Sequence, residues 1–543
     1  MPPSLPYLEP SGPYAEPWAA GMTKRLVFSS WTATPTAIAS LLSQRVGRAV
    51  AQDSPRRDDT EPGRRATRSL LNYAVSDGKA ASMTTLALFW PMPGLAAQAD
   101  PLTAAGRAGT TVTAGSVERD LTRTLRTGAS KYDVVAVADA ARAAIAAPGS
   151  LPDGFRGGSN NIRTELTKLL SAGDTAEAAA GVGRRAHVDE AFRLMQDGPG
   201  VETAAVAPTL AAVAAHSPAN IAWRAFRRLA SGHDLVTEEG LWRAAATVAA
   251  AFRSLFNRPE TILLLEQLDD RGAYWQKVLR YCAAGNLQAA LDEYLHHRVN
   301  ETRKNVGDGI LLELAQSVAQ VISLPSATYR AFDPENPDTA IPLTSRFALR
   351  YGGPRTEENV RQSDVRAAFN SPFWPFVLAS TSVGQEGIDF HWWCSAIVHW
   401  NTPANPVDFE QREGRVDRYG GHAVRRNLAH RHGAAMLGAD DPWRAAYELG
   451  KDERSNLGEF APHWVYPGPA TIERHLSPYP LSVDVARLER LKSDLALYRL
   501  TFGQPRQEDM LALLRKRGLE AQPEVMTQMR IDLSAPTVTG EKR

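Results

Sequence analysis

The chain has 543 residues, enough for two to four domains that each bury a core of their own. Its 61 Lys and Arg residues against 60 Asp and Glu give a net charge of +1, which excludes attraction of the whole molecule to polyanions, so any contact with nucleic acid must come from a local patch. The two cysteines, Cys282 and Cys394, are too few for a disulfide framework. No apolar run approaches the roughly 18 residues of a membrane span, and the proline-rich N-terminus lacks the features of a signal peptide. We therefore expect a cytoplasmic protein with no membrane segment.

The first part of the chain predicts a strand followed by a helix. "KRLVFSSW" (residues 24–31) is a short apolar run with polar flanks, typical of a buried strand. "TPTAIASLLSQRV" follows with helical spacing, with Thr34 as the capping residue and Pro35 at the first helical position. From about Gly47 to Ala340, alanine-rich helical patterns alternate with Gly, Asp and Pro breaks. This long stretch predicts a mainly helical region.

One acidic pair in that region imitates a metal-binding box. "LDEYLHH" (residues 291–297) spells Asp-Glu-x-x-His, but an acidic pair that holds Mg²⁺ in a nucleotide site should end a buried strand. Here the apolar residues recur three and four apart, which predicts a helix. We expect no metal site there, and no other His or Cys group has zinc-ligand spacing.

Alternating elements return near residue 346. "RFALRYGG" predicts a strand, "ENVRQSDVRAAFN" a helix, "PFVLAST" and "SAIVHWN" two further strands, and "NPVDFEQREGRVDR" a helix. This order and spacing is typical of a parallel α/β sheet. After about residue 425 the pattern is helical again, through "DVARLERLKSDLALYRL" to the end.

Three arginines in the last of these α/β elements recur at a regular interval. Arg412, Arg415 and Arg418 are three residues apart, which predicts that they share one helical face, where their charges repel unless an anion neutralises them. Gly414 would let a phosphate or a backbone come close. Upstream, "STSVGQEGIDF" (residues 380–390) follows a predicted strand, at the sheet edge where open α/β sheets bind ligands. Both segments indicate a ligand site at the same edge.

These two segments resemble motifs V and VI of superfamily 2 helicases and translocases, most closely the Swi/Snf-like branch. "STSVGQEGIDF" is similar to motif V, "QREGRVDR" to the Q-R-x-G-R-x-x-R pattern of motif VI, and "RLVFSSW" to motif IV. The resemblance covers about residues 24–46 and 345–425. It implies an α/β fold, the RecA-like parallel sheet of a second helicase domain, with a large mainly α-helical insertion and a helical C-terminal extension. The implied division is an interdomain linker at 1–23, the RecA-like domain at 24–46 and 341–430, the insertion at 47–340 and the extension at 431–543.

The resemblance also implies roles for individual residues. Arg415 and Arg418 match the two arginine fingers, whose planar guanidinium groups would reach the γ-phosphate of ATP. Four residues would serve nucleotide binding: Gln411, Arg412, Gly387 and Asp389, the last by contacting ribose or a neighbouring arginine. Four more would approach nucleic acid or the domain interface: Thr381, Ser382, Gly384 and Gln385.

One part of the family pattern is missing. Such motors need a P-loop, G-x-x-x-x-G-K-[ST], and this sequence contains none, because "SDGKAAS" and "LGKDERS" lack both the earlier glycine and the following Ser or Thr. ATP and Mg²⁺ would then be held mainly by a separate P-loop domain. Two functions remain open: the C-terminal half of an ATP-dependent helicase or translocase that acts on nucleic acid, expected to be DNA, or a non-catalytic nucleic-acid-binding or scaffold subunit.

Two further segments offer weaker candidates for nucleic-acid contact. Trp392 and Trp393 follow motif V and could stack on a base, although one of them is expected to fill the core. "RRNLAHRH" (residues 425–432) either extends a basic patch toward a phosphate backbone or forms a solvated helix.

Overall fold

The structure is a computed structural model of the chain. It describes residues 1–52, 69–126, 137–171, 178–198, 204–302, 306–332, 335–336, 340–352, 361–381, 388–403, 406–453, 458–476, 479, 482–500, 507–518 and 524.

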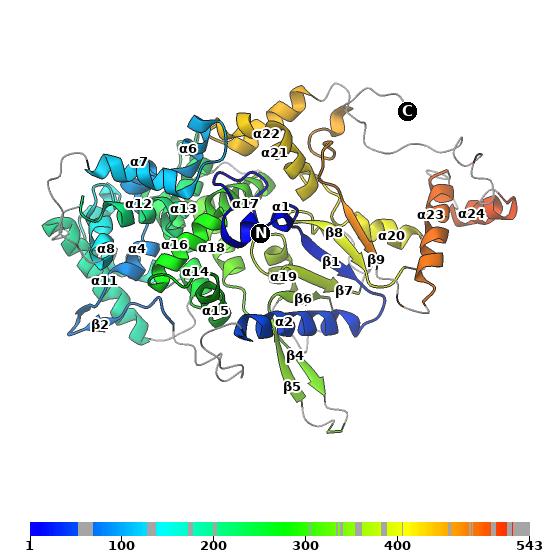
Figure 1. Ribbon diagram of the computed structural model, residues 1–543, viewed down its shortest axis with the longest axis horizontal. Helices are drawn as coiled ribbons and strands as arrows, with labels where there is room; N and C mark the ends of the chain where they lie inside the picture. Colours follow the sequence, from blue (N-terminus) through cyan, green and yellow to red (C-terminus); the bar gives the residue numbers. More distant parts are fainter. Residues whose placement is uncertain are drawn as a thin grey trace.

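A five-stranded parallel sheet forms the α/β part, in the order β6-β7-β1-β8-β9 (Figure 1). Its strands are β6 (Ala348–Tyr351), β7 (Val377–Ser380), β1 (Lys24–Phe28), β8 (Cys394–His399) and β9 (Glu473–Leu476). Strand β1 lies in the middle, with Leu26 opposite Leu378 of β7 on one side and Ile397 of β8 on the other. The predicted parallel sheet is therefore present.

The alternation of side chains along β1 explains how helices cover both faces of the sheet. Leu26 and Phe28 belong to a buried cluster that includes Phe369 of α19 (Gln362–Phe369). Val27, between them, packs with Ile38 of α2 (Thr34–Gln52) on the opposite face, because successive side chains of a strand point to opposite sides.

Between α2 and β6, the described residues form a helical region with a core of its own, seen in cyan and green in Figure 1. Its central helix, α14 (Glu238–Phe256), packs against α13 (Pro218–Ala230) and α18 (Asp308–Ile322). Thr237 caps α14 by accepting a hydrogen bond from the backbone N–H of Gly240, and alanines let neighbouring helices approach it. The other helices of this region are α4 (Thr84–Phe89), α5 (Pro93–Gln98), α6 (Pro101–Ala108), α7 (Ala114–Arg126), α8 (Val137–Ala146), α9 (Asp153–Arg156), α10 (Asn160–Leu169), α11 (Ala178–Asp197), α12 (Ala207–His216), α15 (Pro259–Leu268), α16 (Tyr274–Ala284) and α17 (Leu287–Thr302).

Two hairpins accompany these helices. Strands β2 (Val75–Ser76) and β3 (Lys79–Ala80) form a short one, and β4 (Ala327–Phe332) and β5 (Ala340–Ser345) form a longer one that projects from the body of the molecule (Figure 1). Before β1 lie the 3-10 helix η1 (Gly12–Ala15) and α1 (Pro17–Ala20).

The C-terminal part differs from the expected helical extension. Helices α20 (Pro406–Glu413), α21 (His422–Leu437), α22 (Pro442–Asp452), α23 (Asp484–Leu500) and α24 (Gln507–Lys516) are present, with the 3-10 helix η3 (Gly458–Phe460). However, β9 returns to the sheet and pairs with β8, so this part also supplies a strand. None of the described helices is both long and apolar enough to cross a membrane.

The structure is continuous at the predicted domain boundary near residue 47. Helix α2 runs without a break from Thr34 to Gln52, through the predicted boundary. At the other end, Val321, Leu324 and Tyr329, all before the predicted boundary at 340, belong to the buried cluster of the sheet. The division into an insertion and a sheet domain stays a prediction.

Candidate nucleotide and nucleic-acid site

The carboxyl ends of three neighbouring strands meet at one edge of the sheet. After β1, the backbone N–H of Ser29 donates to the carbonyl of Ser380, the last residue of β7, at 3.0 Å. The backbone N–H of Ser30 donates to the side-chain oxygen of Asn401, which follows β8, at 2.8 Å. Thr381, the first predicted site residue after β7, therefore lies at this edge.

Arg412 of α20 is buried beside this edge of the sheet. Its guanidinium lies over the ring of Phe28, 5.6 Å from the ring centre, and donates to the Asn401 carbonyl at 3.3 Å and to the Ser30 hydroxyl at 3.4 Å. The residue is 3% exposed, and burial lowers the pKa of its guanidinium. Arg412 thus holds the strand ends together, whereas its neighbour Gln411 is exposed.

The expected common face of the three arginines does not lie on one continuous α-helix. Helix α20 ends at Glu413 and continues into a turn, in which the N–H of Arg415 donates to the Arg412 carbonyl and the N–H of Asp417 to the Glu413 carbonyl, both at 3.3 Å. This turn brings the Arg415 and Arg418 side chains to residues 388–390. The Arg415 guanidinium donates to the carbonyl of Ile388 at 3.1 Å, and the Arg415 carbonyl accepts from the backbone N–H of Phe390 at 2.9 Å.

Arg418 and Asp389 form an ion pair beside this contact. The Arg418 Nε lies 2.9 Å from the Asp389 carboxylate, and the two side chains are 37% and 34% exposed. Asn370, at the end of α19, donates to the Asp389 carbonyl at 2.8 Å and so fixes its backbone. A pair this exposed contributes only about 0–1 kcal/mol, so an anionic ligand can compete for the guanidinium. Of the two partners expected for Asp389, ribose or an arginine, the structure places the arginine against it.

The remaining predicted residues lie outside this geometry. Ser382, Gly384, Gln385 and Gly387 lie outside the described residues.

Of the two Gly-Lys pairs, Gly78-Lys79 lies in the tight β2–β3 turn and Gly450-Lys451 lies inside α22, so neither forms a phosphate loop between a strand and a helix.

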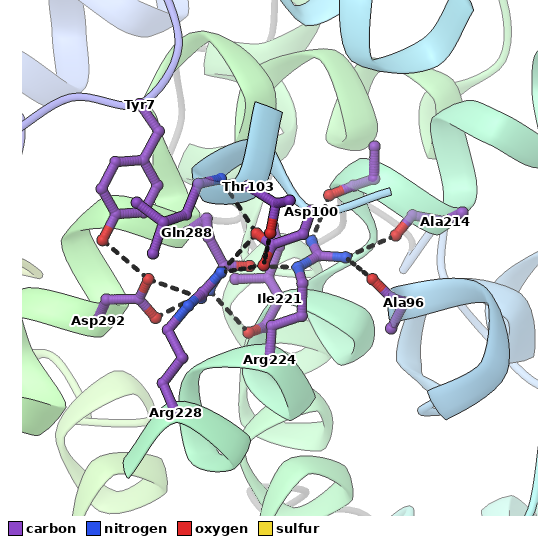
Figure 2. Close-up of polar contacts among 12 residues, drawn as sticks. Tyr7, Ala96, Asp100, Thr103, Ala214, Ile221, Arg224, Arg228, Gln288 and Asp292 are labelled. Carbon is purple, nitrogen blue, oxygen red and sulfur yellow. Dashed lines mark hydrogen bonds and ion pairs between the residues drawn. The ribbon is translucent and has the colours of Figure 1, made fainter. Parts of the chain in front are cut away.

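The acidic pair in "LDEYLHH" lies in helix α17, as predicted, and both carboxylates have partners within the protein. Figure 2 shows Asp292 within a buried network: it pairs with Arg228 at 2.8 Å and accepts from the Tyr7 hydroxyl at 3.0 Å and from Gln288 at 2.9 Å. Arg228 also pairs with Asp100, the N-cap residue of α6. Burial raises the pKa of Asp292. This network joins the N-terminal segment to three helices, and nowhere in the described residues do His, Cys, Asp and Glu gather as a metal site would require.

Both of the weaker candidates for nucleic-acid contact are buried in part. Trp393 is 1% exposed, and Trp392 packs between His391, His297 and the Arg425 guanidinium. Arg425, in "RRNLAHRH", is itself 1% exposed and pairs with Glu293 of α17, so this segment is neither a basic patch nor a solvated helix at that position.

A comparison with known families bears on this same part of the chain. Residues 350–420, from β6 to the turn after α20, match the family described as the helicase conserved C-terminal domain. This match supports a helicase C-terminal domain at residues 350–420. This family has a RecA-like α/β fold, in agreement with the parallel sheet. No curated protein and no solved structure matches the chain significantly.

Proposed function

We propose that the chain is the C-terminal half of an ATP-dependent helicase or translocase of the Swi/Snf-like kind, acting on DNA. It would supply motif V and the two arginines of motif VI to an ATP site completed by a separate P-loop domain. The observation that supports this proposal is the pairing of Arg415 and Arg418 with the residues that end motif V, Ile388 to Phe390, inside the segment that matches the helicase family.

The chemistry of the two arginines fits phosphoryl transfer. A guanidinium presents a planar fork of donors that binds two phosphate oxygens at once and stabilises the charge that develops on them. Arg418 is about a third exposed and held by one carboxylate, so its fork can turn to a phosphate. Arg415 is also held by its backbone, which keeps it in place whatever its side chain contacts. The Mg²⁺ that accompanies ATP would be held by acidic residues of the P-loop domain.

The test uses this chain together with a P-loop domain that restores nucleic-acid-stimulated ATP hydrolysis. Arg415→Lys and Arg418→Lys should each lower turnover by about 10³-fold or more, because an ammonium lacks the planar fork. Melting temperature and nucleic-acid affinity should stay close to those of the parent.

Arg25 provides a matched control for Arg418. It pairs with Glu473 at 2.7 Å, and the two side chains are 37% and 33% exposed, almost the same as in the Arg418–Asp389 pair. Arg25→Lys should therefore keep full turnover. If Arg415→Lys and Arg418→Lys also hydrolyse ATP normally, the scaffold function replaces the motor. Robust hydrolysis by the chain alone would contradict the need for a second domain.

A further inference from the structure

Three large aromatic side chains are exposed beside the Arg418 turn. Tyr419, Phe460 and Trp464 are 50%, 68% and 46% exposed. Tyr419 directly follows Arg418, and the other two lie in and just after η3. We refer to Tyr419, Phe460 and Trp464 as the aromatic platform.

The ring of Tyr419 is the outer member of a stack. It lies nearly parallel to the His463 ring, with a centroid distance of 4.5 Å and an interplanar angle of 10°. The other side of His463 contacts the buried Tyr447 ring, with a centroid distance of 4.7 Å and an angle of 22°. Because His463 covers one face of the Tyr419 ring, solvent reaches the opposite face and the edge. Trp464 stands almost perpendicular to Tyr419, at 81° and 6.1 Å.

The backbone holds this arrangement in place. Gly420 adopts a φ of +63°, which a residue with a side chain rarely takes, and its N–H donates to the His463 carbonyl at 2.7 Å. The Trp464 N–H donates to the Phe460 carbonyl, also at 2.7 Å. A preformed aromatic surface loses little conformational entropy when a ligand stacks on it, which favours binding.

The charges around the platform indicate the class of ligand. Arg418 lies one residue from Tyr419, and its side chain is 37% exposed. Burial and the nearby Lys451 lower the pKa of His463, so the imidazole under Tyr419 is neutral at neutral pH and adds no charge to the stack. A ligand that suits both features has a flat π face and a negative group next to it, which is the chemistry of a nucleotide.

We propose that the aromatic platform binds a nucleobase by stacking on the open face of Tyr419, with Trp464 as a side wall. The choice of ligand rests on the proposed function. The base can belong to single-stranded nucleic acid or to the ATP whose phosphates would meet Arg418, and the experiment separates the two sources.

The experiment uses the full chain alone and needs neither a P-loop domain nor hydrolysis. Binding of a labelled oligothymidylate of about 16 nucleotides is compared with that of an abasic strand of the same length, which keeps the phosphates and lacks the bases. Binding of ADP is measured in parallel. Tyr419→Ala and Trp464→Ala should each weaken oligothymidylate binding about 5- to 150-fold and leave the abasic strand unaffected, whereas Tyr419→Phe should stay within about twofold.

Phe332→Ala is the matched control, because Phe332 is 58% exposed on β4 of the projecting hairpin. Loss of ADP binding with unchanged oligothymidylate binding supports the platform and assigns the base to the nucleotide. Two outcomes overturn the proposal. In the first, the parent binds the abasic strand with the same affinity as oligothymidylate, and neither variant changes ADP binding. In the second, Tyr419→Phe loses as much affinity as Tyr419→Ala. Such a result together with inactive Arg418→Lys would reject the platform and leave the proposed function standing.

Discussion

The buried ion pair between Glu293 and Arg425 allows a quantitative test of the packing around the candidate site. The Arg425 Nε lies 2.7 Å from the Glu293 carboxylate, and the two side chains are 1% and 0% exposed. Glu293 also accepts hydrogen bonds from the backbone N–H and the hydroxyl of Ser4, both at 2.8 Å. Arg425 donates to the carbonyls of Gly420, at 2.8 Å, and of Trp392. The pair therefore connects α17 with the N-terminal segment, with Gly420 after Arg418 and with Trp392 before β8.

Replacing Arg425 by Met keeps much of the side-chain volume and removes the charge. Glu293 is then left in a site that water does not reach, with Ser4 as its remaining hydrogen-bond partner. Breaking a buried pair in this way costs about 3–5 kcal/mol, because the lone charge keeps its desolvation penalty. The double variant Glu293→Gln/Arg425→Met carries neither charge, so it should be less destabilised than Arg425→Met alone. We expect a coupling energy of about 1–3 kcal/mol between the two positions.

Urea unfolding followed by tryptophan fluorescence and circular dichroism measures these differences. The control is Arg431→Met, which removes the partner of Glu453 from a pair that is 57% and 37% exposed and should cost less than about 1 kcal/mol. A cost of less than about 1 kcal/mol for Arg425→Met, or strict additivity in the double variant, would refute the reasoning.

Three further predictions concern pH and packing. Burial lowers the pKa of His391 from 6.5 to about 4, so the unfolded chain takes up a proton on this residue between those values while the folded chain does not. The free energy of unfolding should thus fall as pH drops from about 6.5 to 4, by up to roughly 3 kcal/mol from this residue, and His391→Asn should flatten that dependence; an unchanged dependence would contradict this. Tyr7→Phe removes a hydrogen-bond donor to the buried Asp292 and should lower the free energy of unfolding by about 1–3 kcal/mol in urea unfolding. An unchanged free energy of unfolding would contradict the network in Figure 2. Replacing residues 47–340 by a Gly/Ser linker removes Val321, Leu324 and Tyr329 from the core of the sheet. We therefore expect this variant to unfold without cooperativity on heating. A sharp thermal transition would show that the sheet folds independently of residues 47–340.

The sequence predicted four strands of the sheet and missed the edge strand β9. Strands β1, β7 and β8 are apolar runs because they are covered on both faces, and such runs can be recognised. Strand β9 lies at an edge and reads Glu-Arg-His-Leu, with no buried residue, so no hydrophobic pattern marks it. Its position depends on pairing with β8 and cannot be found from its own residues.

In the candidate site, too, some features could be predicted from the sequence and others could not. The segments at residues 388–390 and 411–418 could be found from the sequence, because they follow predicted strands and resemble helicase motifs, and Gly414 after Glu413 was an available signal that α20 ends there. The burial of Arg425 could not be predicted, because its partner Glu293 lies 132 residues earlier in the chain. The stack of Tyr419 on His463 could not be predicted, because the two residues are far apart in the chain.

The central place of β1 has a consequence for how the protein is made on the ribosome. Arg25 of β1 pairs with Val377 of β7 and Ala396 of β8, so this strand has no neighbour until about 350 more residues have been synthesised. At translation rates of about 5–20 residues per second, that interval lasts roughly 20–70 s. The helices of the intervening region have their own core and can form during this time, while the apolar Leu26-Val27-Phe28 run stays exposed. Exposed apolar β segments are prone to aggregate, so β1 is at risk of aggregation until β7 and β8 have been synthesised.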